Sequence, residues 1–163
     1  MRNYKKRVVI TGVGPVTPVG IGKEAYWKSL IQGKSSFKRI TFPDRNMDQY
    51  RCQIAAPIEE FDLGHYVEKS KHSRHLGKTS QFAIAATSLA LKDAGIELEK
   101  NDLEKEDLHK QTGVYHLKGL DSFQVGIILG VGVEAMDLME HFHERFLSRG
   151  PKGISPFALP NIY

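Results

Sequence analysis

Two segments of the chain share one pattern, in which a short run of aliphatic residues enters a glycine-rich loop. Residues 8–11 read Val-Val-Ile-Thr and lead into Gly12-Val-Gly14, and residues 125–129 read Val-Gly-Ile-Ile-Leu and lead into Gly130-Val-Gly132. Short apolar runs bounded by turn residues are typical of strands that are buried on both faces. The pattern therefore predicts two buried strands, each followed by a tight loop.

Three further segments repeat their apolar residues at helical spacing and stop at a glycine. Helices are expected over residues 23–32, 79–94 and 135–147, ending at Gly33, Gly95 and Gly150. Prolines 15 and 18 keep the chain before the first helix extended through Gly20, because each proline disfavours helix in the preceding residue. Strand, glycine loop and helix thus occur twice, which favours an α/β fold.

The middle helix is rich in alanine on one face. Phe82, Ala85, Ala86, Leu89 and Ala90 form a stripe of mostly small side chains. Small side chains allow a neighbouring element to approach closely, so this helix is expected to pack tightly against a partner helix or sheet.

The remaining segments have no sustained period. Residues 34–71 indicate an irregular excursion with one strand at 53–55, and the charged residues 97–124 indicate a mobile surface excursion. Residues 150–160 contain three prolines and are expected to form an extended loop.

Composition narrows the class of protein. The chain has 163 residues, of which 40% are hydrophobic and 26% charged, and these values fit one soluble globular domain. A net charge of +4 is too small to indicate nucleic acid. Val125 to Val133, the longest stretch without charged or strongly polar residues, is far shorter than a membrane span. The single cysteine, Cys52, excludes an internal disulfide and suits a reducing cytoplasm.

The second glycine loop partly matches a dinucleotide-binding motif. Gly130-x-Gly132-x-x-Ala135 follows a predicted strand and opens a predicted helix, where backbone amides could hold a pyrophosphate. That motif also needs an acidic residue after the next strand, and here the chain enters a proline-rich loop instead. Glu134 would repel a phosphate. Close turn packing is therefore favoured over nucleotide binding, and no cofactor is expected.

Other reactive side chains do not form a convincing site. His72-x-x-His75 and His141-x-His143 lack a third ligand at metal spacing, so structural roles are favoured over zinc binding. Cys52 follows Arg51, but no glycine-flanked helix start follows it to hold a thiolate. The residues alone offer no nucleophile paired with a base.

Taken in order, four motifs resemble the N-terminal portion of a β-ketoacyl-acyl carrier protein synthase, the elongating condensing enzyme of fatty acid and polyketide synthesis. They are the opening strand and loop at 8–20, the helix with its Gly-Lys-Ser exit at 26–35, the alanine-rich helix at 79–95, and the strand at 125–132 with the Gly-Pro-x-x-x-Ser-Pro-Phe loop at 150–157. The resemblance covers nearly the whole chain.

This resemblance implies a thiolase-like, layered αβαβα architecture, in which each half carries a five-stranded sheet. Residues 1–163 would be a partial N-terminal β-ketoacyl synthase domain with only the first strands of the first half. It also implies an acyl carrier protein bearing an acyl or malonyl group as partner, and a homodimer or a complementing polypeptide. The cysteine count, charge and hydropathy separately predict a cytoplasmic location and no nucleic acid or membrane partner.

The resemblance places the reactive residues outside this chain. The family's nucleophilic cysteine lies at a helix N-terminus downstream of the Ser155-Pro-Phe loop, and two histidines follow it. Cys52 matches none of them, so the chain alone is expected not to catalyse the condensation. Val133 matches a hydrophobic residue that borders the acyl pocket. Ala158 replaces a second aromatic residue and is followed by Leu159, which implies a wider or relocated acyl tunnel.

Two alternatives remain open beside a condensing-enzyme portion. The chain could be a noncatalytic thiolase-like interaction module, or a nucleotide-binding α/β protein that uses residues 130–135. Two central strands without neighbours would leave backbone groups unpaired, at roughly 1 to 3 kcal/mol for each buried group. We therefore expect the isolated chain to aggregate or to stay partly folded.

Overall fold

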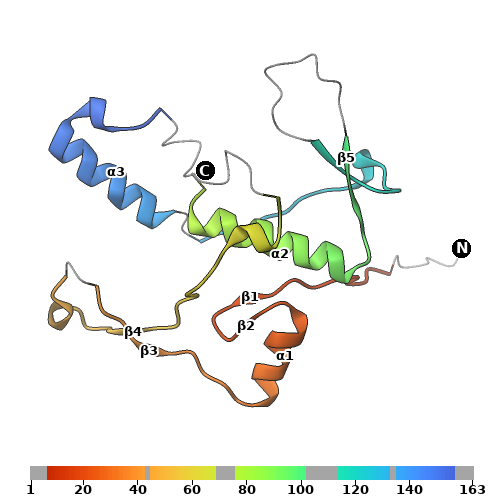
Figure 1. The fold of residues 1–163 in the computed structure, drawn as a ribbon, viewed down its shortest axis with the longest axis horizontal. Coiled ribbons are helices and arrows are strands. Elements are labelled where there is room, and N and C mark those ends of the chain that lie inside the picture. Colours follow the sequence, from red (N-terminus) through yellow and green to blue (C-terminus); the bar gives the residue numbers. More distant parts are fainter. Residues whose placement is uncertain (1–6, 43–44, 69–75, 102–113, 133–134, 157–163) are drawn as a thin grey trace, which may run out of the picture.

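A computed structural model describes residues 7–42, 45–68, 76–101, 114–132 and 135–156. Three helices organise these residues, and the longest lies at the centre of the molecule (Figure 1). They are α1 at Lys23–Ile31, α2 at Lys78–Asp93 and α3 at Met136–Arg149. The three predicted helices are confirmed, with bounds that differ from the predicted ones by one or two residues.

Glycines end the helices as their positions predicted. Gly33, Gly95 and Gly150 have φ angles of 62°, 69° and 67°, in the left-handed region that a side chain disfavours. After α1 the amide of Lys34 donates to the carbonyl of Ser29 at 3.0 Å, and after α2 the amide of Ile96 donates to Leu91 at 2.9 Å. These bonds satisfy carbonyls that the helix itself leaves unpaired.

The described strands form three separate antiparallel hairpins. They pair β1 Val16–Thr17 with β2 Gly20–Ile21, β3 Lys38–Arg39 with β4 Ile54–Ala55, and β5 Leu98–Asn101 with β6 Val114–Leu117. The strand predicted at 53–55 is confirmed as β4. The extended loop predicted through Gly20 is wrong, because the chain turns back on itself there and the Thr17 hydroxyl donates to the carbonyl of Gly20 at 2.8 Å.

The charged stretch after α2 is also more ordered than its sequence pattern predicted. Within it, β5 and β6 pair from Leu98 opposite Leu117 to Asn101 opposite Val114. Lys118 forms ion pairs with Glu97 at 2.8 Å and with Glu99 at 3.7 Å across the hairpin. Cross-strand charge pairing of this kind supports a hairpin without any hydrophobic period.

The two predicted buried strands are the main correction. Residues 8–11 and 125–129 are not in a strand, and they pair with no other described segment. Their side chains are largely exposed, with Val8 at 95%, Ile10 at 87% and Ile128 at 97% of full exposure. An extended segment becomes a strand only when a neighbour supplies hydrogen bonds, and no described segment lies alongside these two.

A small core surrounds α2. Ala85 is completely buried, and the ring of Phe82 meets that of Phe61 edge-on, with centroids 4.8 Å apart. Phe61 also stacks on Tyr66 at 5.6 Å. The Ser88 hydroxyl donates to the carbonyl of Tyr66 at 2.7 Å. These contacts fix the segment around the short 3-10 helix at 63–65 onto α2.

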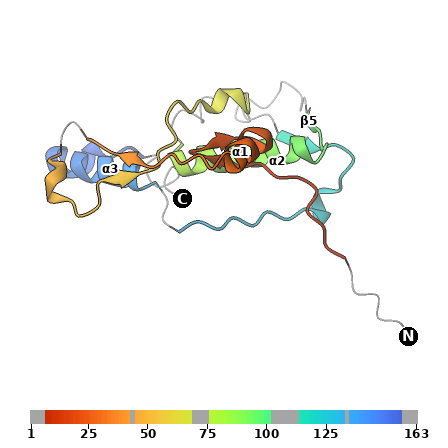
Figure 2. The ribbon, with the colours of Figure 1, turned by 90° about the horizontal axis from the view of Figure 1, so that it is seen from below.

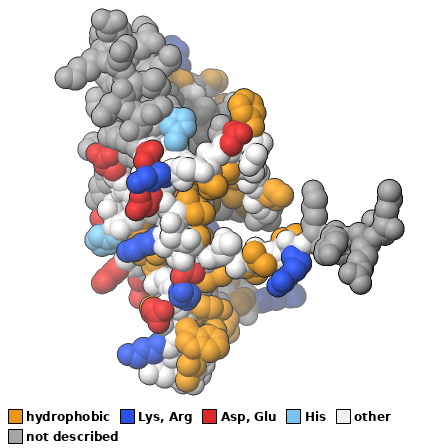
Figure 3. All heavy atoms as spheres, turned by 90° about the vertical axis from the view of Figure 1, so that its right-hand side faces the viewer, with side chains coloured by type: hydrophobic (Ala, Val, Ile, Leu, Met, Phe, Trp, Pro, Cys, Tyr) orange, Lys and Arg blue, Asp and Glu red, His pale blue; other side chains and the backbone are white. Residues whose placement is uncertain are grey.

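Outside this core the molecule is open. Figure 2 shows α1, α2 and α3 in one layer, with the extended chain that leads to α3 running apart from it. Many large apolar side chains of the described residues are exposed, among them Trp27 at 60%, Phe37 at 72% and Ile127 at 85% of full exposure. Figure 3 shows hydrophobic side chains on the surface beside charged ones. The described residues thus fold locally but leave much apolar surface uncovered.

Candidate functional site

The first glycine loop lies directly on the backbone of α2. A Cβ added to Gly12 would stand 2.2 Å from the carbonyl oxygen of Ala90, and one added to Gly14 would stand 2.0 Å from that of Ala86. Real Cβ atoms never come this close to another heavy atom, so only glycine fits at both positions. The close packing predicted from the small residues of this helix is confirmed. The predicted partner helix or sheet is wrong, because the loop at 12–14 packs there instead.

Asp93, the last residue of α2, ties this loop to α1. One carboxylate oxygen accepts from the backbone amide of Val13 at 3.1 Å, and the other accepts from the ammonium of Lys23 in an ion pair. The hydrogen bond from Lys23, followed by that from Val13, holds the pKa of Asp93 below its ordinary value of 3.8. The same partnership raises the pKa of Lys23 above 10.5. The sequence analysis did not identify this junction.

A surface cleft of about 730 Å³ opens between the loop, α1 and α2. It is lined by Gly12, Val13, Gly14, Pro15, Lys23, Glu24, Tyr26, Trp27 and Ala90. The lining is largely backbone and apolar side chain, and it includes neither a cysteine nor a histidine. The cleft could accept an apolar group, but it holds no nucleophile with a base to activate it.

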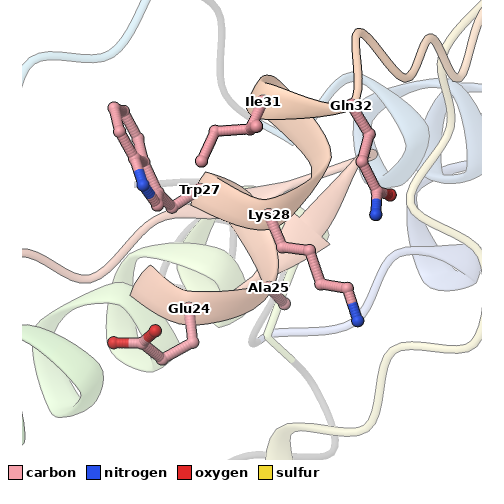
Figure 4. Close-up of a pocket in the computed structure, with 6 residues that line it drawn as sticks. All are labelled: Glu24, Ala25, Trp27, Lys28, Ile31 and Gln32. Atoms are coloured by element: carbon pink, nitrogen blue, oxygen red, sulfur yellow. The ribbon is translucent and has the colours of Figure 1, made fainter.

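A smaller hollow of about 370 Å³ lies on the surface of α1. Its lining residues belong to this helix, apart from Gln32, which directly follows it. Figure 4 shows Trp27 and Ile31 on one side of the helix and Lys28 on the other. A hollow built by a single nine-residue helix has no opposing wall. It is a depression of the surface rather than an enclosed binding site.

The predicted acyl-pocket residues Val133, Ala158 and Leu159 lie outside the described residues, as do His72 and His75. Among the candidates that are described, Cys52 is exposed and its thiol lies 3.5 Å from the carbonyl oxygen of Ile54. His141 contacts the ring of Phe142, with centroids 5.9 Å apart. Within the described ranges no three His, Cys, Asp or Glu side chains group so that they could hold a metal ion.

The second glycine loop differs from the first. A Cβ on Gly130 or Gly132 would meet no described atom within 4 Å. Just beyond this loop Ala135 is buried and has a left-handed φ of 45°, and its Cβ would lie 3.1 Å from one added to Gly77. The starts of α2 and α3 therefore meet at two small residues. The small residues Gly77 and Ala135, next to the two helix starts, were the available sequence signal for this contact.

None of the helices in the described part of the chain has the length and apolar character that crossing a membrane requires.

Comparison with known families defines the class of protein. The model of the family "Beta-ketoacyl synthase, N-terminal domain" matches residues 5–144. The match includes both glycine loops, α1, α2 and most of α3. The chain therefore belongs to the β-ketoacyl synthase family.

Individual relatives narrow this further. The chain is 31% identical to the 3-oxoacyl-[acyl-carrier-protein] synthase 2 of Vibrio harveyi over 96% of its own length and 32% of the relative's. It is 27% identical to the protein of the same name from Staphylococcus aureus strain COL, over 98% of its own length and 33% of the relative's. It thus spans about a third of the curated relatives that it matches.

A solved structure shows the fold. The ishigamide ketosynthase/chain length factor matches with a TM-score of 0.62 and 21% identity, over 95% of this chain and 33% of that one. The predicted thiolase-like α/β class is confirmed, and only part of the enzyme fold is present. Residues 8–11 and 125–129 pair with no other described strand, as expected for a partial fold.

Proposed function

We propose that this chain is the N-terminal part of a 3-oxoacyl-[acyl carrier protein] synthase, which condenses an acyl thioester with malonyl-acyl carrier protein in fatty acid or polyketide synthesis. The observation that carries the proposal is the family match over residues 5–144. Relatives named as 3-oxoacyl-[acyl-carrier-protein] synthases, aligned over nearly the whole chain, support it. Residues 1–163 would then be a partial N-terminal β-ketoacyl synthase domain.

In this proposal the chain provides scaffold rather than reactive groups. The loop at 12–14, α1 and α2 form a tightly packed unit in which the described residues offer no cysteine paired with a histidine. The nucleophile and its histidines would belong to chain beyond the matched third. The protein would work in the cytoplasm on acyl carrier protein, as a homodimer or with a complementing polypeptide.

The acyl pocket is proposed to include Val133, Ala158 and Leu159. Acyl chains bind in cavities lined by apolar side chains, and the volume of those side chains limits chain length. Alanine at position 158 leaves room that an aromatic side chain would fill. In an active enzyme that contains this chain, Ala158→Phe is expected to shift the preferred acyl substrates toward shorter chains, while Ala158→Ser leaves the preference unchanged.

A joined enzyme tests the proposed function. Residues 1–163 would replace the matching third of the Vibrio harveyi synthase, and condensation of acyl- and malonyl-acyl carrier protein would be measured by mass spectrometry. We expect 3-oxoacyl product from the joined enzyme, and the same rate within about threefold after Cys52→Ser, because Cys52 is assigned no catalytic role. A folded joined enzyme that binds acyl carrier protein and forms no product would contradict the proposal.

A further inference from the structure

The cleft between residues 12–15, α1 and α2 has the size of a small-molecule site. Its volume of about 730 Å³ lies within the range of about 300–1,000 Å³ that is typical of ligand pockets. Its walls are already in place, because Gly12 and Gly14 pack on the backbone of α2 and Asp93 ties the loop to α1. A ligand would therefore enter a cleft that keeps its shape without it.

The chemistry of the cleft differs from one part to another. Gly12, Gly14, Pro15 and Ala90 contribute backbone and small apolar groups, on which an aliphatic or aromatic body can lie. Tyr26 and Trp27 add two aromatic rings from α1. Tyr26 is half-buried, whereas Trp27 is 60% exposed and presents its ring to a ligand. The face of a tryptophan ring attracts cations more strongly than that of any other aromatic side chain.

The two charged side chains of the cleft are in different states. Lys23 is paired with the carboxylate of Asp93, so its charge is already compensated. Glu24 forms no hydrogen bond or ion pair with any residue that the structure describes. Lys92 lines a neighbouring hollow together with Asp93, and it does not line this cleft. The uncompensated charge within the cleft is therefore negative.

Glu24 and Trp27 lie where one cation can contact both. They are three residues apart on α1, a spacing that places side chains on the same face of a helix. Figure 4 shows both side chains on the same side of α1, with Lys28 on the other side. A carboxylate beside an exposed tryptophan ring is a combination that binds ammonium groups.

We propose that this cleft binds a small organic cation, an ammonium group attached to an aliphatic or aromatic body. The ammonium lies between the carboxylate of Glu24 and the ring of Trp27, and the body lies on residues 12–15. The site is separate from the acyl pocket proposed at Val133, Ala158 and Leu159, because an acyl chain carries no positive charge. A lysine side chain of a peptide has the same head group, but the size of the cleft favours a separate small molecule.

The fluorescence of Trp27 provides a direct test, because this is the single tryptophan of the chain. Residues 1–163 are titrated at pH 7 with hexylammonium, hexan-1-ol and hexanoate, which share a six-carbon body and differ in charge. We expect hexylammonium to change the emission saturably and to bind about fivefold or more tightly than hexan-1-ol, with hexanoate weakest. Equal affinities for the three probes would overturn the proposal. Tighter binding of the peptide acetyl-Gly-Lys-Gly-amide than of hexylammonium would overturn the assignment to a small molecule.

Matched variants separate the role of Glu24 from damage to the cleft. Glu24→Gln should weaken hexylammonium binding by about fivefold or more and leave hexan-1-ol within about twofold of the parent. Glu60→Gln makes the same change at an exposed carboxylate that does not line the cleft, and should leave both affinities within about twofold. Trp27→Leu, measured by calorimetry, should weaken hexylammonium binding more than hexan-1-ol binding. Equal effects of Glu24→Gln and Glu60→Gln would contradict a cation site at Glu24.

Helix circular dichroism during a urea titration shows whether α1 and α2 are folded in the isolated chain. If they are not, the same probes and variants are compared by calorimetry in the joined enzyme, in which residues 1–163 replace the matching third of the Vibrio harveyi synthase. Binding of hexylammonium that depends on Glu24 supports the proposal there, and its absence overturns it. Product formation is measured separately, so it tests the proposed function alone.

Discussion

The two glycine loops follow similar aliphatic runs but have opposite surroundings. Around Gly14 the backbone of α2 leaves no room for even one added carbon atom, whereas around Gly130 no described atom comes within 4 Å. The first loop has its packing partner within the described chain, in the alanine face of α2. The second loop and the strand-like residues before it have none there.

The contrast shows that one local pattern can have two different outcomes. A short apolar run followed by glycines sets the tendency to extend and then turn. Whether the run becomes a strand, and whether its glycines are required, depends on the neighbour that packs against it. A side chain added at Gly14 tests the packing of the first loop. The same substitution at Gly130, in the second loop, serves as the control.

Gly14→Ala is expected to have the largest effect. The added carbon would collide with the carbonyl of Ala86 and the amide of Ala90, which are backbone atoms and cannot rotate away. Overpacking of this kind costs about 2–3 kcal/mol, measured as a lower local stability of the unit around α2 in a urea titration followed by helix circular dichroism. Gly130→Ala should stay within about 0.5 kcal/mol of the parent. Equal stabilities for the two variants would remove the contrast between the loops.

The aromatic cluster on α2 gives the next effect. Phe82→Ala removes the edge-on contact with Phe61 from a half-buried position and should cost about 2 kcal/mol in the same titration. Phe123→Ala deletes the same side chain where it is 98% exposed, so its effect should be under about 0.5 kcal/mol. If Phe123→Ala were the more destabilising of the two, residues 119–132 would be packed rather than open.

The smallest effect is expected at the Asp93 junction, because its ion pair is exposed and screened by solvent. The pKa of Asp93 is lowered on folding, so its contribution is complete above the ordinary pKa of 3.8 and is lost as pH falls through the lower folded value. Asp93→Asn should therefore lower the melting temperature at neutral pH, and the difference from the parent should vanish in strong acid.

A matched variant on an independent ion pair separates the junction from general charge effects. Glu59→Gln breaks the exposed pair with Lys38, which lies on the β3–β4 hairpin far from α2 in the sequence. It should not change exchange at the Val13 amide, whereas Asp93→Asn should speed that exchange, since the amide loses its acceptor. Faster exchange at Val13 in both variants would contradict a specific junction.

The helices were the part of the fold that the sequence pattern predicted best. α2 combines an alanine-rich stripe with a terminal glycine, so its formation depends mainly on its own residues and local capping. The hairpins were mostly missed, because β1 and β2 are two residues each and depend on one turn, while β5 and β6 are held by charge pairs. Such elements carry no hydrophobic period.

The candidate site was predictable only through the resemblance. Spacing alone assigned no role to Val133, Ala158 or Leu159, and all three lie outside the described residues, so their acyl-pocket role stays a prediction. The small residues of α2 predicted close packing against this helix. They did not identify Gly12 and Gly14 as the residues that pack there. A contact between segments about 75 residues apart depends on tertiary structure that local periodicity does not encode.

The most direct test of the account is condensation by the purified chain alone, supplied with acyl- and malonyl-acyl carrier protein and compared with the full Vibrio harveyi synthase. The account predicts no 3-oxoacyl product above that of the carrier proteins without enzyme, because the reactive cysteine and histidines are assigned to chain outside residues 1–163. Sustained turnover by this polypeptide without another protein would contradict it.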